Sequence, residues 1–232
     1  FAERFGSNFE IIVSINHSSD RTEEIVRELM PCHPQLRMLV DPRPIGKGGA
    51  IMAAGRIATG EWIGFVDADG ATPPWAFDDL VKNIGDAGLI IASRRLPGSV
   101  IKPRQPWKRR AVSRVFNFLV RYLFKLKITD TQCGAKLMSA VAWKAIVPHI
   151  GLTKWAFDVD MLFKTRRAGY PILEIPTTWS DIAGSKLRIG RASTQMLLAI
   201  ARLRLLYSPL RWIVALYDRL LGRVIDLNAI EP

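Results

Sequence analysis

Four short apolar runs, separated by segments with helical periodicity, dominate the first hundred residues and limit the folds open to this chain. The runs lie at residues 9–15, 36–40, 62–66 and 89–92, and they are rich in β-branched and aromatic side chains. Each has the length of a strand and is followed by a helix-like segment, so the pattern predicts an α/β fold with a mostly parallel sheet and helices on both faces. In such sheets, ligands bind at the carboxyl ends of the strands.

Acidic and glycine-rich loops follow two of these strands. Asp67 and Asp69 form a D-x-D directly after the third run. Two carboxylates in that position can hold a divalent cation against the phosphates of a substrate. The run Gly-Lys-Gly-Gly at 46–49 lies at the start of a predicted helix, where backbone N–H groups and the Lys47 ammonium can face a diphosphate. Each motif taken alone is also typical of an ordinary tight turn.

Two further acidic motifs follow later in the chain. Asp130 opens the run Asp-Thr-Gln-Cys-Gly at 130–134, and Trp-Ala-Phe-Asp-Val-Asp at 155–160 opens another predicted helix. Acids two positions apart on a helix point about 200° apart, so at most one of Asp158 and Asp160 can face a site. An acid in the first helical turn also serves simply as a cap or as a partner of the helix dipole.

The charge of the chain requires anionic partners. The 232 residues include 33 Lys and Arg against 21 Asp and Glu, a formal net charge of +12. Nucleic acid, an anionic lipid surface and phosphorylated small molecules all match this charge. A nucleic-acid-binding module is a weaker interpretation because no such motif occurs and the aromatic residues at 116–124 fall in the apolar part of a predicted helix. We therefore expect no nucleic acid partner.

Basic amphipathic helices are predicted at 108–127 and after Pro209. On the first, Arg110, Arg114, Asn117, Arg121 and Lys125 share one face. Such helices are typical of proteins that lie on an anionic membrane, although surface helices packed on a core have the same pattern.

No run of about 18 uncharged apolar residues occurs, so the sequence predicts no membrane span. Cys32 and Cys133 lie far apart and outside any C-x-x-C motif, as in cytoplasmic proteins with reduced thiols. The prediction is a cytoplasmic protein, peripheral on the cytoplasmic face of a membrane, with a catalytic domain at 1–190 and a membrane-associating helical tail at 191–232.

Five motifs in a fixed order carry a family resemblance. They are Asp-Ala-Asp-Gly-Ala-Thr-Pro at 67–73, Ser93-Arg94, the motifs at 130–134 and 155–158, and Ile-Pro-Thr-Thr-Trp-Ser-Asp-Ile-Ala-Gly-Ser-Lys at 175–186. Over residues 9–212 the chain resembles the family 2 inverting glycosyltransferases of the dolichyl-phosphate β-glucosyltransferase and polyprenyl-phosphate mannosyltransferase type. The resemblance implies a GT-A fold and transfer of a sugar, with glucose expected, from UDP-glucose or GDP-mannose to a polyprenyl or dolichyl phosphate.

The resemblance also implies roles for individual residues. Asp69, together with Asp67, would hold Mg²⁺ or Mn²⁺ on the donor diphosphate, and Asp67 would contact the nucleotide. Lys47 falls where the family has a basic loop in the nucleotide-sugar site. The residues that would bind the lipid phosphate are Ser93, Arg94, Arg109 and Ser113. The residues at the reacting centre would be Asp158, Asp130 and Arg94.

Three departures from the family pattern affect the prediction. The family normally begins with a strand that ends in a nucleotide-binding loop, and this chain starts after it, so we expect the sheet to lack its first strand. The paired acids usual after the next strand are replaced by Ile15 and Asn16, which leaves base or ribose recognition to Asn16 or to other groups. Ala71 stands where the mannosyl branch has a glutamine, and this favours the glucosyl branch.

The acceptor determines what the acids must do. A phosphate monoester is already ionised near neutral pH, so no strong base is needed, and Asp158 and Asp130 would position groups or stabilise charge. Two alternatives stay open. In one, the same fold uses a hydroxyl acceptor and Asp158 is a true base. In the other, the chain is an inactive remnant on the membrane surface.

Overall fold

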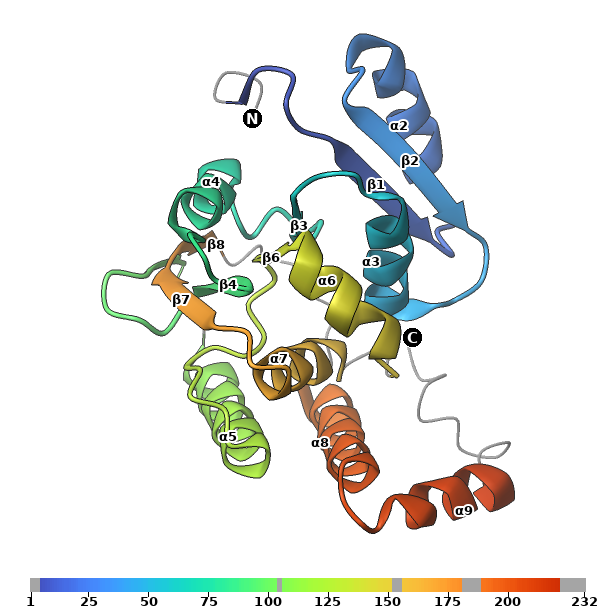
Figure 1. Cartoon of the computed structure of the whole chain (residues 1–232), viewed down its shortest axis with the longest axis vertical. Helices are drawn as coiled ribbons and strands as arrows, with labels where there is room; N and C mark the ends of the chain where they lie inside the picture. Colours follow the sequence, from blue (N-terminus) through green and yellow to red (C-terminus); the bar gives the residue numbers. More distant parts are fainter. Residues whose placement is uncertain (1–4, 104–105, 152–155, 181–188, 222–232) are drawn as a thin grey trace.

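Strands and helices alternate along the chain in the computed structural model, which describes residues 5–103, 106–151, 156–180 and 189–221 (Figure 1). The first part contains β1 (Ile11–Asn16), α2 (Thr22–Leu29), the 3₁₀ turn η1 (Met30–Cys32), β2 (Leu36–Asp41), α3 (Gly46–Ile57), β3 (Trp62–Phe65), α4 (Pro74–Asn83) and β4 (Leu89–Ser93). The second part contains β5 (Val100–Lys102), α5 (Trp107–Phe124), β6 (Lys136–Ser139), α6 (Ala140–Ile146), the 3₁₀ turn η2 (Val147–His149), α7 (Phe157–Arg167), β7 (Ile172–Pro176), β8 (Thr178–Ser180), α8 (Ile189–Leu206) and α9 (Arg211–Leu221).

The described strands form three sheets rather than one. β1 and β2 pair in parallel, from Ile11 opposite Leu36 to Asn16 opposite Asp41. The central sheet has the order β3-β6-β4-β7, in which β4 and β7 are parallel and β6 is antiparallel to β3 and β4. β5 and β8 form a third, parallel pair. The expected parallel arrangement is therefore correct for most pairs, and β6 is the exception.

The glycine-rich helix α3 packs closely on its neighbours. The Ser14 hydroxyl of β1 donates to the carbonyl oxygen of Ala50, at 3.1 Å. A Cβ atom at Gly55 would lie 2.0 Å from the ring of Trp143 on α6. Only a glycine fits between these two helices at this point, near the carboxyl end of α3.

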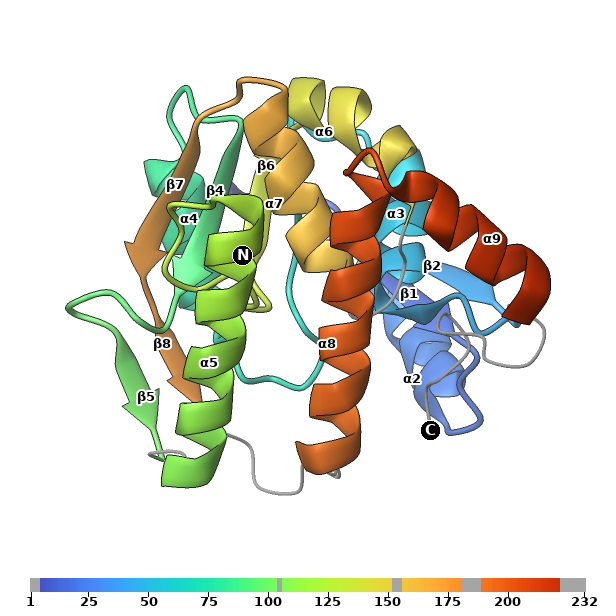
Figure 2. The same cartoon turned by 90° about the horizontal axis from the view of Figure 1, so that it is seen from below.

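The main core lies between the central sheet and the long helices α5, α7 and α8. Phe116, Val120 and Phe124 of α5 pack in the same cluster as Ile200 and Leu203 of α8. Figure 2 shows α5 and α8 side by side. Helix α8 thus belongs to the core, although most of it lies beyond the domain boundary predicted at residue 190.

The structure divides the apolar residues of α5 between two faces. Phe116 and Phe124 are buried, whereas Val115, Phe118 and Tyr122 are 60%, 65% and 74% exposed. Phe118 and Tyr122 are therefore exposed, although the sequence analysis placed all the aromatic residues at 116–124 in the apolar part of the helix. Asn117 is also buried rather than on the basic face. The core contacts of α5, and not its periodicity, decide which stripe faces inward. No described helix is both long and apolar enough to cross a bilayer.

Candidate active site

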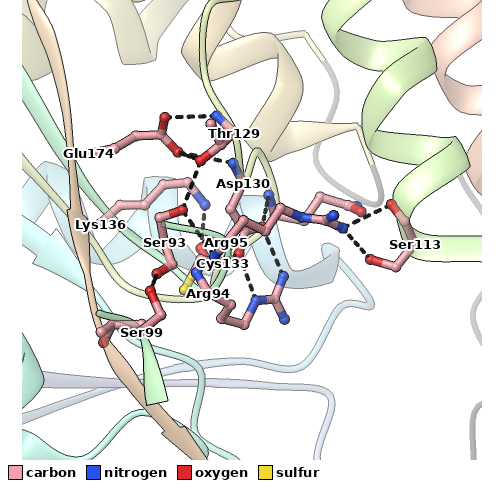
Figure 3. Close-up of polar contacts among 12 residues, drawn as sticks. Ser93, Arg94, Arg95, Ser99, Ser113, Thr129, Asp130, Cys133, Lys136 and Glu174 are labelled. Atoms are coloured by element: carbon pink, nitrogen blue, oxygen red, sulfur yellow. Dashed lines mark hydrogen bonds and ion pairs between the residues drawn. The ribbon is translucent and has the colours of Figure 1, made fainter. Parts of the chain in front are cut away.

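Two charged clusters lie at the ends of the central strands, and they contain most of the predicted site residues. The first joins Lys47, Asp67, Asp158 and Lys136 through ion pairs. The second joins Arg94 and Asp130, with Arg95 and Ser113 beside them (Figure 3). Residues from six separate segments meet here, because the carboxyl ends of β3 and β4, the amino ends of α3, α7 and β6, and helix α5 lie close together.

Positive and negative charges alternate in the first cluster. The Lys47 ammonium lies 2.7 Å from Asp67 Oδ1 and 3.5 Å from Asp158 Oδ2. The other oxygen of Asp158 lies 2.6 Å from the Lys136 ammonium, which also donates to the carbonyl oxygen of Cys133 at 2.5 Å. Lys136 was not predicted from the sequence. Its only signal there is a lysine inside an apolar strand.

The pKa of Asp158 shows which effect prevails in this cluster. Burial alone would raise the pKa of its carboxyl, but Lys136 and Lys47 outweigh burial and hold that pKa below its usual range. Asp158 also lies in the first turn of α7, where the helix dipole favours an anion. The side chain is therefore an anion with both oxygens engaged, which makes it a poor proton acceptor.

Asp67 is held in place by the loop at 130–134. Its backbone N–H donates to the carbonyl oxygen of Gly134, at 3.1 Å. A Cβ atom at Gly134 would lie 2.0 Å from Asp67 Oδ2. The glycine of the Asp-Thr-Gln-Cys-Gly motif is thus required by the close approach of this carboxylate.

The predicted metal ligands fit a divalent cation that shares substrate oxygens. Asp69 is exposed, and its Oδ1 accepts a hydrogen bond from the backbone N–H of Ala71, at 2.9 Å. Among the described residues, no group of three or more His, Cys, Asp or Glu side chains could hold an ion. Mg²⁺ and Mn²⁺ prefer oxygen ligands, and Mg²⁺ in nucleotide sites is bound by one or two carboxylates plus phosphate oxygens. Asp67 and Asp69 meet that requirement.

Asn16 lies at the end of β1, beside the loop that leads into α3. Its Oδ1 accepts a hydrogen bond from the backbone N–H of Ile45, at 3.0 Å. The contact supports the start of α3 and so helps to place Lys47. Recognition of a base or ribose by Asn16 stays a prediction.

Arg94 and Asp130 form the centre of the second cluster. Arg94 Nε and Nη2 donate to the two Asp130 oxygens at 2.7 and 2.9 Å, and the Arg94 backbone N–H donates at 3.0 Å. Burial would raise the pKa of Asp130, but its bonds with Arg94 hold that pKa below the usual value. Glu174 of β7 accepts hydrogen bonds from the backbone N–H groups of Thr129 and Asp130 (Figure 3). Asp130 therefore holds Arg94 in position.

A cavity of about 520 Å³ opens beside Arg94. Arg95, at its wall, donates through Nη2 to the carbonyl oxygen and the hydroxyl of Ser113, at 3.0 and 2.8 Å (Figure 3). Four arginines, two serines and two apolar side chains line it, namely Arg94, Arg95, Arg110, Arg114, Ser99, Ser113, Ile101 and Trp179.

The cavity contains only part of the group predicted to bind a lipid phosphate. Arg94 and Ser113 line it, but Ser93 and Arg109 are not among the described residues that do so. Ser93 is fully buried, with its hydroxyl 3.0 Å from that of Thr129. The sequence analysis left out Arg95, and it placed Arg110 on a basic face without assigning it to the site.

The motifs at 155–158 and 175–186 lie only partly within the described residues. Asp158 and the run at 175–180 are described, whereas Trp155 and residues 181–186 fall outside. The part that is described contributes Trp179, whose ring lies 5.4 Å from the Arg94 guanidinium.

Several curated proteins similar to this chain are dolichyl-phosphate beta-glucosyltransferases. A dolichyl-phosphate beta-glucosyltransferase of Trichomonas vaginalis is 34% identical over 189 residues, covering 78% of this chain and 56% of that protein. The dolichyl-phosphate beta-glucosyltransferase of Dictyostelium discoideum is 33% identical over 208 residues, covering 86% of this chain and 64% of that protein. The chain therefore spans 56% and 64% of the lengths of these two relatives, which is less than two thirds in both cases.

Solved structures with a similar fold are more distant in sequence. A mannosyltransferase of Pyrobaculum calidifontis, in complex with GDP-Man and Mn²⁺, has a TM-score of 0.56 at 19% identity and covers 81% of this chain and 52% of that one. Glucosyl-3-phosphoglycerate synthase of Mycobacterium tuberculosis, in complex with Mn²⁺, UDP and glucosyl-3-phosphoglycerate, has a TM-score of 0.58 at 18% identity, covering 85% and 68%. These likenesses confirm the expected GT-A fold.

The family model described as glycosyl transferase family 2 matches residues 1–146, more than half of the chain. Together with the fold and the order of the acidic motifs, this match shows that the chain belongs to glycosyltransferase family 2.

Proposed function

We propose that this chain carries the catalytic site of an enzyme that transfers glucose from a nucleoside-diphosphate glucose to dolichyl phosphate or a similar polyprenyl phosphate, with inversion at the anomeric carbon. The observation that supports it best is the loop at 130–134. Its Asp130 side chain binds Arg94 at the arginine-lined cavity, and its Gly134 carbonyl binds Asp67 in the other cluster. One loop thus holds the binding groups for two anionic reactants side by side.

The donor would bind at the first cluster. Asp67 and Asp69 would hold a divalent ion, which offsets negative charge on the departing diphosphate when bound. Lys47, in the first turn of α3, adds a cation and a helix amino terminus beside the phosphates. The Mn²⁺ in similar solved structures and the name of the curated relatives support this arrangement and the choice of glucose.

The acceptor phosphate would bind in the cavity among Arg95, Arg110 and Arg114, with Arg94 next to it. A phosphate oxygen then forms the bond to the anomeric carbon as the bond to the diphosphate breaks, and single displacement inverts that carbon. The acceptor is already ionised, so no base is required. The lowered pKa of Asp158 and its two lysine partners disfavour a hydroxyl acceptor, which would need that carboxylate as a base.

A lipid acceptor also requires the enzyme to reach a membrane surface. Val115, Phe118 and Tyr122 form an exposed stripe along α5, and Arg110 and Arg114 of the same helix line the cavity. We propose that this stripe enters the interface of an anionic membrane on its cytoplasmic face. Within the tail predicted at 191–232, helix α9, with Trp212 exposed, would be the membrane-associating part, whereas α8 packs in the core.

The test is incubation of the complete natural protein with polyprenyl phosphate and labelled UDP-glucose or GDP-mannose, followed by organic extraction. We expect label from UDP-glucose in an acid-labile lipid, and its loss with EDTA. Asp69→Asn should abolish transfer, whereas the matched control Asp79→Asn, on the exposed face of α4, should not. Arg114→Ala should chiefly raise the KM for the lipid.

Other outcomes would overturn the proposal. Label that appears only with a hydroxyl acceptor would replace the substrate class. Failure of the protein to bind UDP in calorimetry with Mn²⁺ would favour an inactive remnant.

A further inference from the structure

Two lysines contact the same carboxylate of Asp158, and their surroundings differ sharply. Lys136 lies on β6, between β3 and β4 in the central sheet, and its side chain is 1% exposed. Lys47 lies in the first turn of α3, and its side chain is 39% exposed. Lys47 is shared between Asp67 and Asp158, whereas the ion pair of Lys136 is with Asp158, so the two lysines need not have the same function.

Lys47 is the partner that can move. Its ammonium is already closer to Asp67, at 2.7 Å, than to Asp158, at 3.5 Å. A diphosphate bound next to Asp67 would bring about two negative charges to this half-exposed ammonium. Lysine is a flexible point charge that binds phosphate readily, so its weaker contact, the one with Asp158, would be exchanged for the donor.

Lys136 is held where it is. Its ammonium donates to the carbonyl oxygen of Cys133 at 2.5 Å (Figure 3). It also donates to Asp158 Oδ1 at 2.6 Å. The same ammonium lies 5.5 Å from the centre of the Phe65 ring, and no path to solvent is open to a side chain that is 1% exposed. Leaving a buried carboxylate without any cation is costly, and Lys136 prevents this once Lys47 has moved.

We propose that Lys47 is an exchangeable counter-ion that leaves Asp158 for the donor diphosphate, and that Lys136 is the fixed counter-ion that positions the Asp158 carboxylate at the reacting centre throughout. The inference rests on the proposed function and adds a division of roles within its site. Lys47 then belongs to donor binding, and Lys136 is a positioning residue that acts on turnover through Asp158. The Asp158 carboxylate would then occupy the same position with and without bound donor. There it would face the positive charge that develops on the sugar during transfer.

The first arm of the test measures binding of UDP-glucose with Mn²⁺ by calorimetry, and it needs no acceptor. Lys47→Met should weaken binding at least about tenfold, the loss expected for one charge-assisted contact. Lys136→Met should weaken binding as well, because Lys47 is then the cation left beside the buried Asp158, and adding Asp158→Asn should restore binding to within about twofold of the unchanged protein. Lys144→Met, an exposed lysine of α6, should stay within about twofold. The loss with Lys47→Met should persist when Asp158→Asn is added. No weakening by Lys47→Met, or its full rescue by Asp158→Asn, would overturn the division.

The second arm measures transfer to polyprenyl phosphate. Lys136→Met should lower kcat about 10²-fold at saturating donor, as for loss of one electrostatic stabiliser. Because Lys136 acts through Asp158, the double variant Lys136→Met/Asp158→Asn should be no slower than Asp158→Asn. A further loss of the same factor in the double variant would refute the positioning role.

Two provisions separate the possible failures. If Lys136→Met does not fold, two other variants can be measured in its place. Lys136→Gln keeps the hydrogen bonds without the charge, and Lys136→Met/Asp158→Asn removes both charges together. If the unchanged protein binds UDP-glucose but transfers nothing to the lipid, the proposed acceptor is wrong, and the first arm still decides between the two lysines.

Discussion

Replacing Asp130 by asparagine should destabilise the protein strongly, because the substitution leaves Arg94 without its carboxylate. Asp130 is 1% exposed and accepts three hydrogen bonds from Arg94. Removing one partner of a buried ion pair costs about 3–5 kcal/mol of unfolding free energy. The Arg94 side chain is 22% exposed at the cavity, so water can solvate it in part, and we expect the lower end, about 3 kcal/mol.

Urea unfolding of the two proteins at neutral pH measures this loss. The matched control is Glu23→Gln, which breaks an exposed pair with Arg27 on α2 and should cost less than about 1 kcal/mol. A loss below about 1 kcal/mol for Asp130→Asn as well would refute the argument that burial gives the Arg94 pair its strength.

The same pair has a predictable pH dependence. The pKa of Asp130 is lower in the folded protein than its ordinary value of about 3.9. Its contribution to stability is therefore fully present above pH about 4 and is lost as the pH falls from there through the lowered pKa. The difference in stability between the unchanged protein and Asp130→Asn should shrink only below pH about 4. A difference that already shrinks between pH 7 and pH 5 would contradict the assigned direction.

Two further predictions concern the donor loop and the membrane surface. Gly134→Ala should displace Asp67, weaken UDP binding in calorimetry and cost about 1–3 kcal/mol in urea unfolding, because its Cβ would lie 2.0 Å from Asp67 Oδ2, while Gly151→Ala, with open space around it, should change neither. Phe118→Ser with Tyr122→Ser should reduce cosedimentation with phosphatidylserine vesicles and leave UDP binding unchanged, and undiminished cosedimentation would exclude this stripe as the docking face.

Local patterns in the sequence were sufficient for the class of fold and for the position of several site residues. The apolar runs had the length of strands, and each of the four contains a strand of the structure. The D-x-D after the third run and the acid at the start of α7 followed from their places beside predicted elements. These features depend on neighbours in the chain, and periodicity and turn chemistry record such neighbours directly.

Contacts between distant segments could not be predicted in this way. Arg94 and Asp130 are 36 positions apart, and Lys136 and Asp158 are 22 apart. Whether a polar side chain at such a distance finds a partner depends on how the strands are ordered, and the antiparallel β6 between β3 and β4 was not expected. The cavity arginines other than Arg94 were missed as site residues for the same reason.

The sequence by itself determined that the chain forms an α/β fold with acids at the ends of its strands, because the alternation of apolar runs and turns leaves few other ways to bury them. The tertiary structure alone decided which side chains share a cluster and which face of α5 is buried. Burial and ion pairing depend on the atoms that surround a group in space, and those atoms come from segments that the linear order does not bring together.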